Sequence, residues 1–176
     1  VHRENHLGDW GLPIAMTLAA LRRQKVDLDR LTLDDLNHAY RSAQAAAKDD
    51  EAGLAAALAV QAGPHRIAEL TLQNEDARAV VDDAKRTLLK LQGGDPELRR
   101  DWQKLIDCTM KEVFEAARIM QVTLGPEHSR GESYFRERLG QVVEQFLAAG
   151  IAKEDRGAIV VPFADRERPL LIRKSD

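Results

Sequence analysis

The sequence predicts an α/β fold that is mostly helical and carries an antiparallel β-hairpin near its C-terminal end. Alanine and leucine are abundant, whereas aromatic residues make up only 5% of the 176 residues, which favours helices over a large sheet. Apolar residues recur at helical spacing along most of the chain. Two short apolar runs, 158–163 and 169–173, follow near the end and are separated by a charged turn, which is typical of a hairpin.

The composition is that of a globular domain. Hydrophobic residues make up 44% of the chain and charged residues 31%, and 176 residues suffice to build one hydrophobic core. The formal net charge of −3 gives no sign of nucleic-acid binding, although an acidic chain can still carry a local basic patch. The single cysteine, Cys108, excludes an internal disulfide and a cysteine-only zinc site, so we expect a reducing, cytoplasmic location.

Targeting and membrane signals are absent from the sequence pattern. There is no signal-peptide pattern and no apolar run of about 18 residues, so we expect no membrane span. The chain begins with Val1 and ends at Asp176, directly after a strand-like run. We therefore expect it to be a piece of a larger protein.

Helical periodicity and its interruptions predict six helical segments. Thr32 with an acid three residues later predicts one helix start, and Asp95 followed by Pro96 predicts another. Gly63-Pro64 predicts a stop or a kink, because proline cannot continue the hydrogen-bond ladder. The predicted segments are residues 12–24, 33–47, 54–58, 65–92, 96–120 and 133–149.

Apolar runs assign the remaining segments and the inward faces. Residues 121–124 predict a short strand and residues 125–131 a polar loop. Trp102 and Cys108 belong to the helix 96–120, whose apolar stripe predicts core packing for both rather than a ligand contact or a nucleophile. The side chains expected to face inward from the last helix are Phe135, Leu139, Val142, Val143, Phe146 and Leu147.

The first candidate site is the segment 5–11, Asn-His-Leu-Gly-Asp-Trp-Gly, directly ahead of the first predicted helix. Glycine lets a backbone turn sharply or approach a ligand closely. Asp9 precedes the helix, where a carboxylate can cap free N–H groups beside the positive end of the helix dipole. Trp10 has no apolar stripe of its own and is a candidate anchor for the turn. The pattern alone fits a purely structural turn equally well.

Two further candidate sites follow along the chain. Residues 129–135, Ser-Arg-Gly-Glu-Ser-Tyr-Phe, place a guanidinium, a carboxylate and hydroxyls around a flexible glycine. The pattern alone favours a simpler interpretation, a helix start capped by Ser129 or Ser133. Residues 173–176, Arg-Lys-Ser-Asp, end a predicted strand, where α/β folds contact phosphates and other ligands. The five histidines show no metal-ligand spacing, and neither a Gly-x-Ser-x-Gly elbow nor a Walker loop occurs.

These three segments, in this order, resemble the catalytic core of arginyl-tRNA synthetase, a class I aminoacyl-tRNA synthetase. Residues 3–11 are similar to the family's Asn-His-x-Gly-Asp-Trp-Gly segment, and residues 129–135 to its Gly-Glu-Ser-aromatic segment. Residues 171–176 are similar to its Lys-Ser-Asp-Gly strand, and residues 101–105 to the helix before the second segment. The family's His-x-Gly-His signature, its Lys-Met-Ser-Lys-Ser-like loop and its anticodon-binding domain have no counterpart in this sequence.

The resemblance implies a partial Rossmann-like catalytic core with a helical insertion. It divides the chain into a core turn and helix (1–25), a helical insertion (26–93) and a return to the core (94–176). For the parent enzyme it implies arginine, ATP with Mg²⁺, and tRNA as substrates and cofactors. The His-x-Gly-His signature and the Lys-Met-Ser-Lys-Ser-like loop are the family's two ATP signatures, and both are missing, so the fragment alone is expected not to aminoacylate. Its exposed strand edges are expected to favour self-association.

The resemblance also implies roles for individual residues, although none is securely catalytic. It makes Gly8 and Gly11 candidates for backbone approach to the nucleotide or the terminal adenosine, held by Asp9 and Trp10. Glu132 is implied as a charge partner for the arginine guanidinium. The other implied binding candidates are His6, Ser133, Lys174 and Asp176. The alternative is a non-catalytic helical module for protein interaction or regulation, since an alanine- and leucine-rich middle would look the same in any helical bundle.

Overall fold

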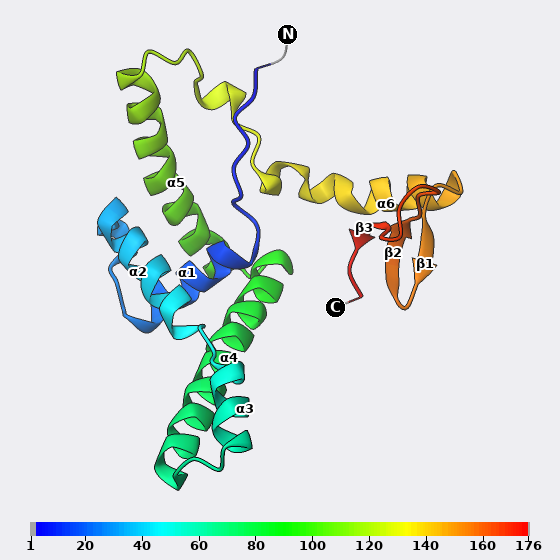
Figure 1. The fold of residues 1–176 in the computed structure, drawn as a ribbon. Helices are drawn as coiled ribbons and strands as arrows, with labels where there is room; N and C mark the ends of the chain where they lie inside the picture. The colour runs from blue at the N-terminus through cyan, green and yellow to red at the C-terminus, as the bar shows by residue number, and fades with distance from the viewer. Residues whose placement is uncertain (1–2, 176) are drawn as a thin grey trace. The chain divides into compact units, whose positions relative to one another are not determined.

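The computed structural model describes residues 3–175, which form two compact units, residues up to Gly131 and residues from Glu132 onward. The first unit is helical (Figure 1). Its α-helices are α1 (Leu12–Arg23), α2 (Leu33–Ala46), α3 (Glu51–Ala59), α4 (Pro64–Gln92) and α5 (Pro96–Ile119). Two short 3₁₀ turns accompany them, η1 (Leu28–Arg30) and η2 (Pro126–His128).

Helix α1 is the centre of the first unit. It packs mainly against α4 and α2, and its side chains supply much of the buried core. One cluster joins α1 to α2 and α5 through Leu21, Leu36 and Leu105. A second cluster surrounds Leu18 and includes Leu91 from the end of α4. The residues of α1 that are buried are Ala15, Thr17, Leu18, Ala19, Ala20 and Leu21.

The helix ends follow the sequence signals closely. Thr32 and Asp35 form the predicted capping box at the start of α2, with each side chain bonded to the other residue's backbone N–H. Asp95 caps α5, where its carboxylate accepts hydrogen bonds from the N–H groups of Glu97 and Leu98. Gly63-Pro64 marks the boundary between α3 and α4, with Pro64 as the first residue of α4.

One sequence prediction for the first unit needs correction, and one buried polar residue was not foreseen. Residues 121–124 form no strand, because α5 ends at Ile119 and the chain continues as an irregular segment. The apolar face of α4 contains a buried polar residue, Asn74, which is only 3% exposed. Its Oδ1 accepts a hydrogen bond of 2.6 Å from the backbone N–H of Asp50, so it secures the turn ahead of α3. Helical spacing cannot reveal such a partner 24 residues away.

The second unit contains one α-helix and one small sheet. A 3₁₀ segment, η3 (Glu132–Arg138), leads into α6 (Leu139–Ala148). Three antiparallel strands follow in the order β1-β2-β3. Their bounds are β1 (Lys153–Asp155), β2 (Ala158–Val161) and β3 (Leu170–Arg173). The predicted hairpin is therefore confirmed as β2 and β3, and β1 is an additional strand that the sequence analysis missed.

The missed strand has a recognisable signal. Arg156 and Gly157 link β1 to β2 and both have positive φ, +51° and +81°, as a two-residue type I′ hairpin turn requires. Glycine occupies the second of these positions, and the apolar run of β2 follows at once. The three residues of β1 are all exposed and charged, so they show no apolar alternation.

The prediction for the last helix is partly wrong. The α-helix begins at Leu139, because the preceding residues form the 3₁₀ segment η3. Only Val143 and Phe146 of the expected inward face pack against the small core of Ala152, Ile159 and Val161. The other four predicted inward residues are exposed, with Leu139 reaching 55%. They are Phe135, Leu139, Val142 and Leu147. Among residues 3–175, no helix is long and apolar enough to cross a membrane.

Candidate functional site

The glycine-bracketed turn of the first candidate site leads directly into α1. Gly11 is the N-cap of α1, with φ −99° and ψ −176°, an extended conformation that other residues also adopt. The Trp10 ring is buried in the cluster that contains Leu18 and Leu91. It meets Trp102 of α5 edge to face, with ring centroids 5.2 Å apart and planes at 79°. The turn is thus anchored by an aromatic pair.

Two side chains from other helices bind the backbone of this turn. The indole Nε1 of Trp102 donates a hydrogen bond of 2.8 Å to the carbonyl oxygen of Asp9. The amide Nε2 of Gln92, the last residue of α4, donates one of 3.3 Å to the carbonyl oxygen of Trp10. Both residues were missed as contributors to the site. The sequence offered one signal for Trp102, because the N–H group of a half-buried indole usually finds a hydrogen-bond acceptor.

Asp9 is not the N-cap of α1, so the prediction that it caps this helix is wrong. The N-cap position belongs to Gly11, which has no side chain to accept a hydrogen bond. The Asp9 side chain is instead buried, with 8% of the residue exposed, and its carboxylate lies against Gly131. A Cβ atom at position 131 would fall within 2.6 Å of Asp9 Cγ and 2.7 Å of Asp9 Oδ1, so only glycine fits beside this carboxylate.

The N-terminal segment pairs with the loop that ends at Gly131. Asn5 N–H donates to His128 O at 2.9 Å, and Arg130 N–H donates to Asn5 O at 2.8 Å, which makes a short parallel bridge between Asn5 and Ser129. His6 Nδ1 lies 3.0 Å from Arg130 O. The first candidate segment and the first three residues of the second are therefore neighbours, although more than 120 residues separate them in the sequence.

The loop 125–131 has an internal hydrogen-bond framework. His128 Nδ1 accepts the Gly125 N–H at 3.0 Å, and Arg130 Nη1 donates to the carbonyl oxygens of Glu127 and Ser129 at 2.9 and 2.8 Å. The Ser129 hydroxyl is buried without a hydrogen-bond partner, one of two such side-chain atoms in the part of the chain that the structure describes. Neither predicted serine caps the following α-helix, since the N-cap of α6 is Arg138.

The remaining candidate residues belong to the second unit. Glu132 is exposed at the first position of η3, and Ser133, which follows it, is half-buried. Lys174 is exposed directly after β3. Asp176 lies outside the described residues. The structure therefore brings His6, Gly8, Asp9, Trp10 and Gly11 into one unit with Gly131, and it describes Glu132, Ser133 and Lys174 in the other.

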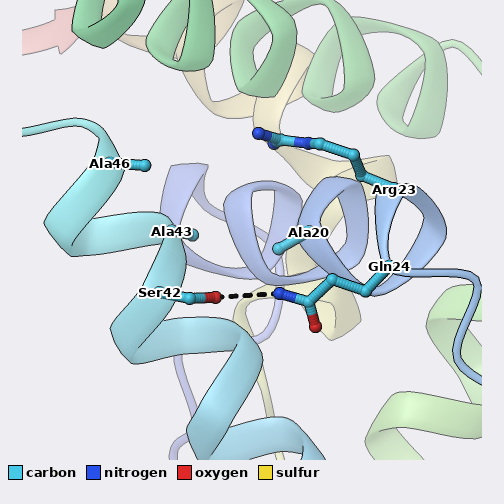
Figure 2. A pocket seen from close by; sticks show the side chains of 6 residues that line it. All are labelled: Ala20, Arg23, Gln24, Ser42, Ala43 and Ala46. Carbon is cyan, nitrogen blue, oxygen red and sulfur yellow. Dashed lines mark hydrogen bonds between the residues drawn. The ribbon is translucent and has the colours of Figure 1, made fainter. Parts of the chain in front are cut away.

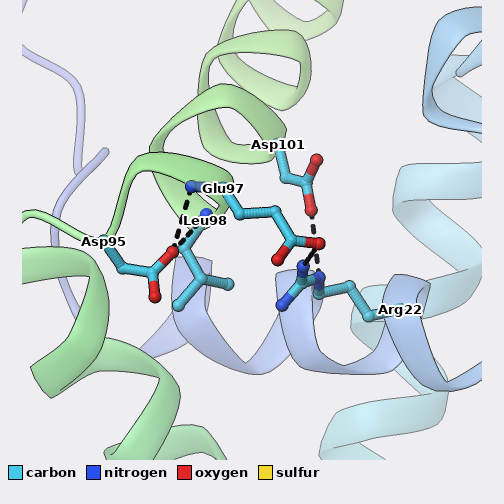
Figure 3. A network of polar contacts seen from close by, with 5 residues as sticks. All are labelled: Arg22, Asp95, Glu97, Leu98 and Asp101. Atoms are coloured by element: carbon cyan, nitrogen blue, oxygen red, sulfur yellow. Dashed lines mark hydrogen bonds and ion pairs between the residues drawn. The ribbon is translucent and has the colours of Figure 1, made fainter.

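An ion-pair network fixes α5, and with it Trp102, against α1. The Arg22 guanidinium in the last turn of α1 binds two carboxylates of α5, those of Glu97 and Asp101, the second at 2.9 Å (Figure 3). Asp95, the cap of the same helix, lies nearby. The Leu98 and Glu97 N–H groups and the charge of Arg22 lower the pKa of its carboxyl. The carboxylate form is thus the form that caps α5.

A groove beside α1 has few side chains that could bind a ligand. It has a volume of about 160 Å³ and lies between α1 and α2, where Gln24 Nε2 donates a 3.0 Å hydrogen bond to Ser42 Oγ across it (Figure 2). Its remaining lining is Ala20, Arg23, Ala43 and Ala46. One guanidinium and three methyl groups do not converge on a ligand. Within residues 3–175, no group of three or more His, Cys, Asp or Glu side chains could hold a metal ion.

Comparison with known proteins decides the family. The model of the class I tRNA synthetase (R) catalytic domain matches residues 1–176. The chain belongs to this family. The resemblance predicted from the sequence is therefore confirmed, and the match over the whole chain favours a synthetase over the alternative of an unrelated helical module.

Relatives within the family are arginine–tRNA ligases. The enzyme of Hamiltonella defensa is 32% identical over 164 residues, which is 92% of this chain and 23% of the relative. That of Cutibacterium acnes is 27% identical over 173 residues, 98% of this chain and 26% of the relative. The crystal structure of Plasmodium falciparum arginyl-tRNA synthetase superposes with a TM-score of 0.59 at 20% identity, covering 99% of this chain and 24% of that one. The structural likeness supports the fold, and the chain spans about a quarter of the length of these relatives.

Proposed function

We propose that the chain is part of an arginine–tRNA ligase. In this reaction the carboxylate of arginine attacks the α-phosphate of ATP, forming arginyl-adenylate and releasing pyrophosphate, and the terminal ribose hydroxyl of tRNA then takes the arginyl group. The observation that carries the proposal is the pairing of residues 5–6 with residues 128–130. Two segments that match the family's motifs, far apart in the sequence, lie side by side, as residues of one binding site must.

The proposed roles are those of positioning and charge stabilisation. Gly8 and Gly11 carry no side chain to obstruct a nucleotide that approaches the turn, and Gly11 stands at the N-cap of α1, beside the positive end of the helix dipole. Asp9 and Trp10 hold this turn in place. His6, bonded through its ring to the Arg130 carbonyl, is proposed to line the same site.

The candidate residues of the second unit are proposed to bind charged groups of the substrates. Glu132 is exposed, and a carboxylate is the complement of the arginine guanidinium. Ser133 is proposed to offer a hydroxyl next to it, and Lys174 a positive charge for the phosphates. Asp176, outside the described residues, completes the set proposed from the sequence.

The cofactor and location are part of the same proposal. Residues 3–175 contain no carboxylate or histidine cluster that suits a metal ion, so Mg²⁺ is proposed to enter with the ATP of the whole enzyme rather than at a site of this chain. We also propose a cytoplasmic location, where arginine, ATP and tRNA are available. The proposed division into 1–25, 26–93 and 94–176 describes sequence segments, whereas the compact units divide at Gly131.

Charging of tRNA with radioactive arginine tests the function. We expect the whole enzyme to charge tRNA and the purified 176-residue chain not to do so, because the chain lacks both ATP signatures. In the whole enzyme, Asp9→Asn and Glu132→Gln should lower kcat, whereas Asp76→Asn and Glu75→Gln, the same changes at exposed positions of α4, should not. Wild-type kinetics in both site variants would show that these residues are not part of the site. Charging of tRNA by the isolated chain would contradict the proposal that the chain needs the rest of the enzyme.

Self-association of the isolated chain is a further part of the proposal. Strands β1 and β3 are the edges of the three-stranded sheet, and Leu170 and Leu171 of β3 are about half exposed. Unpaired backbone groups beside exposed leucines favour strand pairing between copies. Size-exclusion chromatography over a range of concentrations should show a larger species, which Leu171→Lys should reduce. A monomer at every concentration would contradict this expectation.

A further inference from the structure

The carbonyl groups of Asp9 and Trp10 present an unusual arrangement just ahead of α1. The hydrogen-bond ladder of α1 begins with the Gly11 carbonyl, which accepts the Ala15 N–H. The two preceding carbonyls lie outside this ladder, yet each accepts a hydrogen bond from a side chain of a different helix. The donors, Trp102 and Gln92, are 93 and 82 residues away in the sequence.

These two bonds define the orientation of the turn. Two consecutive carbonyl groups held from α5 and α4 fix the direction of two consecutive peptide planes, Asp9–Trp10 through Trp102 and Trp10–Gly11 through Gln92. The Trp10 ring, packed edge to face on Trp102, removes the remaining rotation of the turn. The Asp9 Cα is joined to the first of these planes, so their orientation limits the directions in which the Asp9 side chain can leave the backbone.

The Asp9 carboxylate fills the space beside Gly131. It is buried against Gly131, and its atoms occupy the space that any Cβ at position 131 would take. A rotation of the Asp9 peptide would therefore move this carboxylate away from Gly131 or press it into the backbone. The loop that ends at Gly131 is in turn bonded to the N-terminal segment through Arg130 and Asn5.

We infer that Trp102 and Gln92 are positioning residues for the reaction, acting through the Asp9–Trp10 and Trp10–Gly11 peptides to place the Asp9 carboxylate against Gly131. The inference rests on the proposed function, which it deepens by assigning the helices α4 and α5 a part in site geometry. Neither side chain touches the reacting atoms in this scheme. Arg22 supports the arrangement indirectly, because its ion pairs with Glu97 and Asp101 hold α5, the helix of Trp102, on α1.

The test uses the whole enzyme and two variants that remove only the donors. Trp102→Phe keeps an aromatic ring against Trp10 but has no N–H, and Gln92→Met keeps the length of the side chain without the amide. Gln103→Met is the matched control, since Gln103 is an exposed residue of α5 whose amide bonds to Asp107 of the same helix. We expect kcat/KM for arginine in tRNA charging to fall about tenfold in each donor variant, as expected for the loss of one hydrogen bond that fixes geometry, and to remain unchanged in the control.

A double variant separates positioning from general destabilisation. If Trp102 acts through Asp9, then Trp102→Phe combined with Asp9→Asn should charge tRNA no more slowly than Asp9→Asn alone. If the double variant loses activity by the product of the two single losses, or if both donor variants have wild-type kinetics, the inference is wrong. Neither result would affect the proposed ligase function. Failure of the wild-type enzyme to use arginine would instead overturn the proposed function, and the inference with it. Should Trp102→Phe fail to fold, Gln92→Met at an exposed position decides the question alone.

Discussion

Replacing Gly131 by alanine should destabilise the first unit through a clash with one buried carboxylate. The added Cβ would lie 2.6 Å from Asp9 Cγ and 2.7 Å from Oδ1, and closer still to Oδ2. Optimal separations between carbon atoms are about 3.5–4.0 Å, so the two groups must move apart by roughly 1 Å. Asp9 is short and buried, and its backbone is bonded to Trp102, so the carboxylate cannot swing away freely.

The expected magnitude follows from the cost of overpacking a tight site, about 1–3 kcal/mol. Because neither partner is flexible, we expect about 2 kcal/mol, which for a unit of this size corresponds to a fall in Tm of roughly 5–10 °C. Both tryptophans of the sequence, Trp10 and Trp102, lie in the first unit. Tryptophan fluorescence during urea or thermal unfolding therefore follows this unit selectively.

Two further variants make the experiment decisive. Gly63→Ala is the matched control in the same unit, because a Cβ there meets no atom within 4 Å. Gly63 is the N-cap of α4, where alanine is less favourable than glycine, but alanine also lowers the entropy of the unfolded chain, so the net change in stability should be no more than about 0.5 kcal/mol. In an Asp9→Ala background the clash is absent, so Gly131→Ala should then cost no more than the control. An unfolding curve for Gly131→Ala that overlays Gly63→Ala, or an equal cost in both backgrounds, would refute the reasoning.

Two other predictions concern the same unit. Leu18→Ala removes a fully buried side chain from the cluster around Trp10 and should cost about 3 kcal/mol in urea unfolding, whereas Leu72→Ala, an exposed leucine of α4, should change little. The lowered pKa of Asp95 means that its contribution to folding is present above the ordinary aspartate pKa and is lost as the pH falls through its lowered pKa. The difference in Tm between the wild type and Asp95→Ala should therefore shrink between about pH 6 and about pH 2; a difference that is constant or grows in acid would contradict this assignment.

Local chemistry made most of the helices predictable. The capping box at Thr32, the Asp95-Pro96 start of α5 and the boundary at Gly63-Pro64 depend on residues within one turn of each other, and all three are confirmed. The parallel pairing of Asn5 with Ser129 depends on contacts across more than 120 residues. The spacing of apolar residues along the chain cannot show such a distant contact. Only the resemblance of both segments to one family suggested that they belong together.

The errors have physical causes of the same kind. Asp9 fits the rule for a helix cap, but the space beside Gly131 and the hydrogen bond from Trp102 fix its side chain elsewhere. The apolar stripe of the last helix predicted more burial than the small sheet of the second unit provides. Strand β1 consists of charged residues and is held by backbone pairing with β2, which leaves no apolar pattern to find.

The buried alanines of α1 have a consequence for how this part of the protein can evolve. Ala15, Ala19 and Ala20 are buried on α1, and Ala20 packs in one cluster with Ala39 and Ala43 of α2. Methyl-sized side chains let helix axes approach closely, and Ala15 and Ala39 are completely buried, so an added methylene at either position has little room. We therefore expect Ala15 and Ala39 to accept only side chains of about the size of glycine, alanine or serine, whereas the exposed positions of the same helices can accept larger ones.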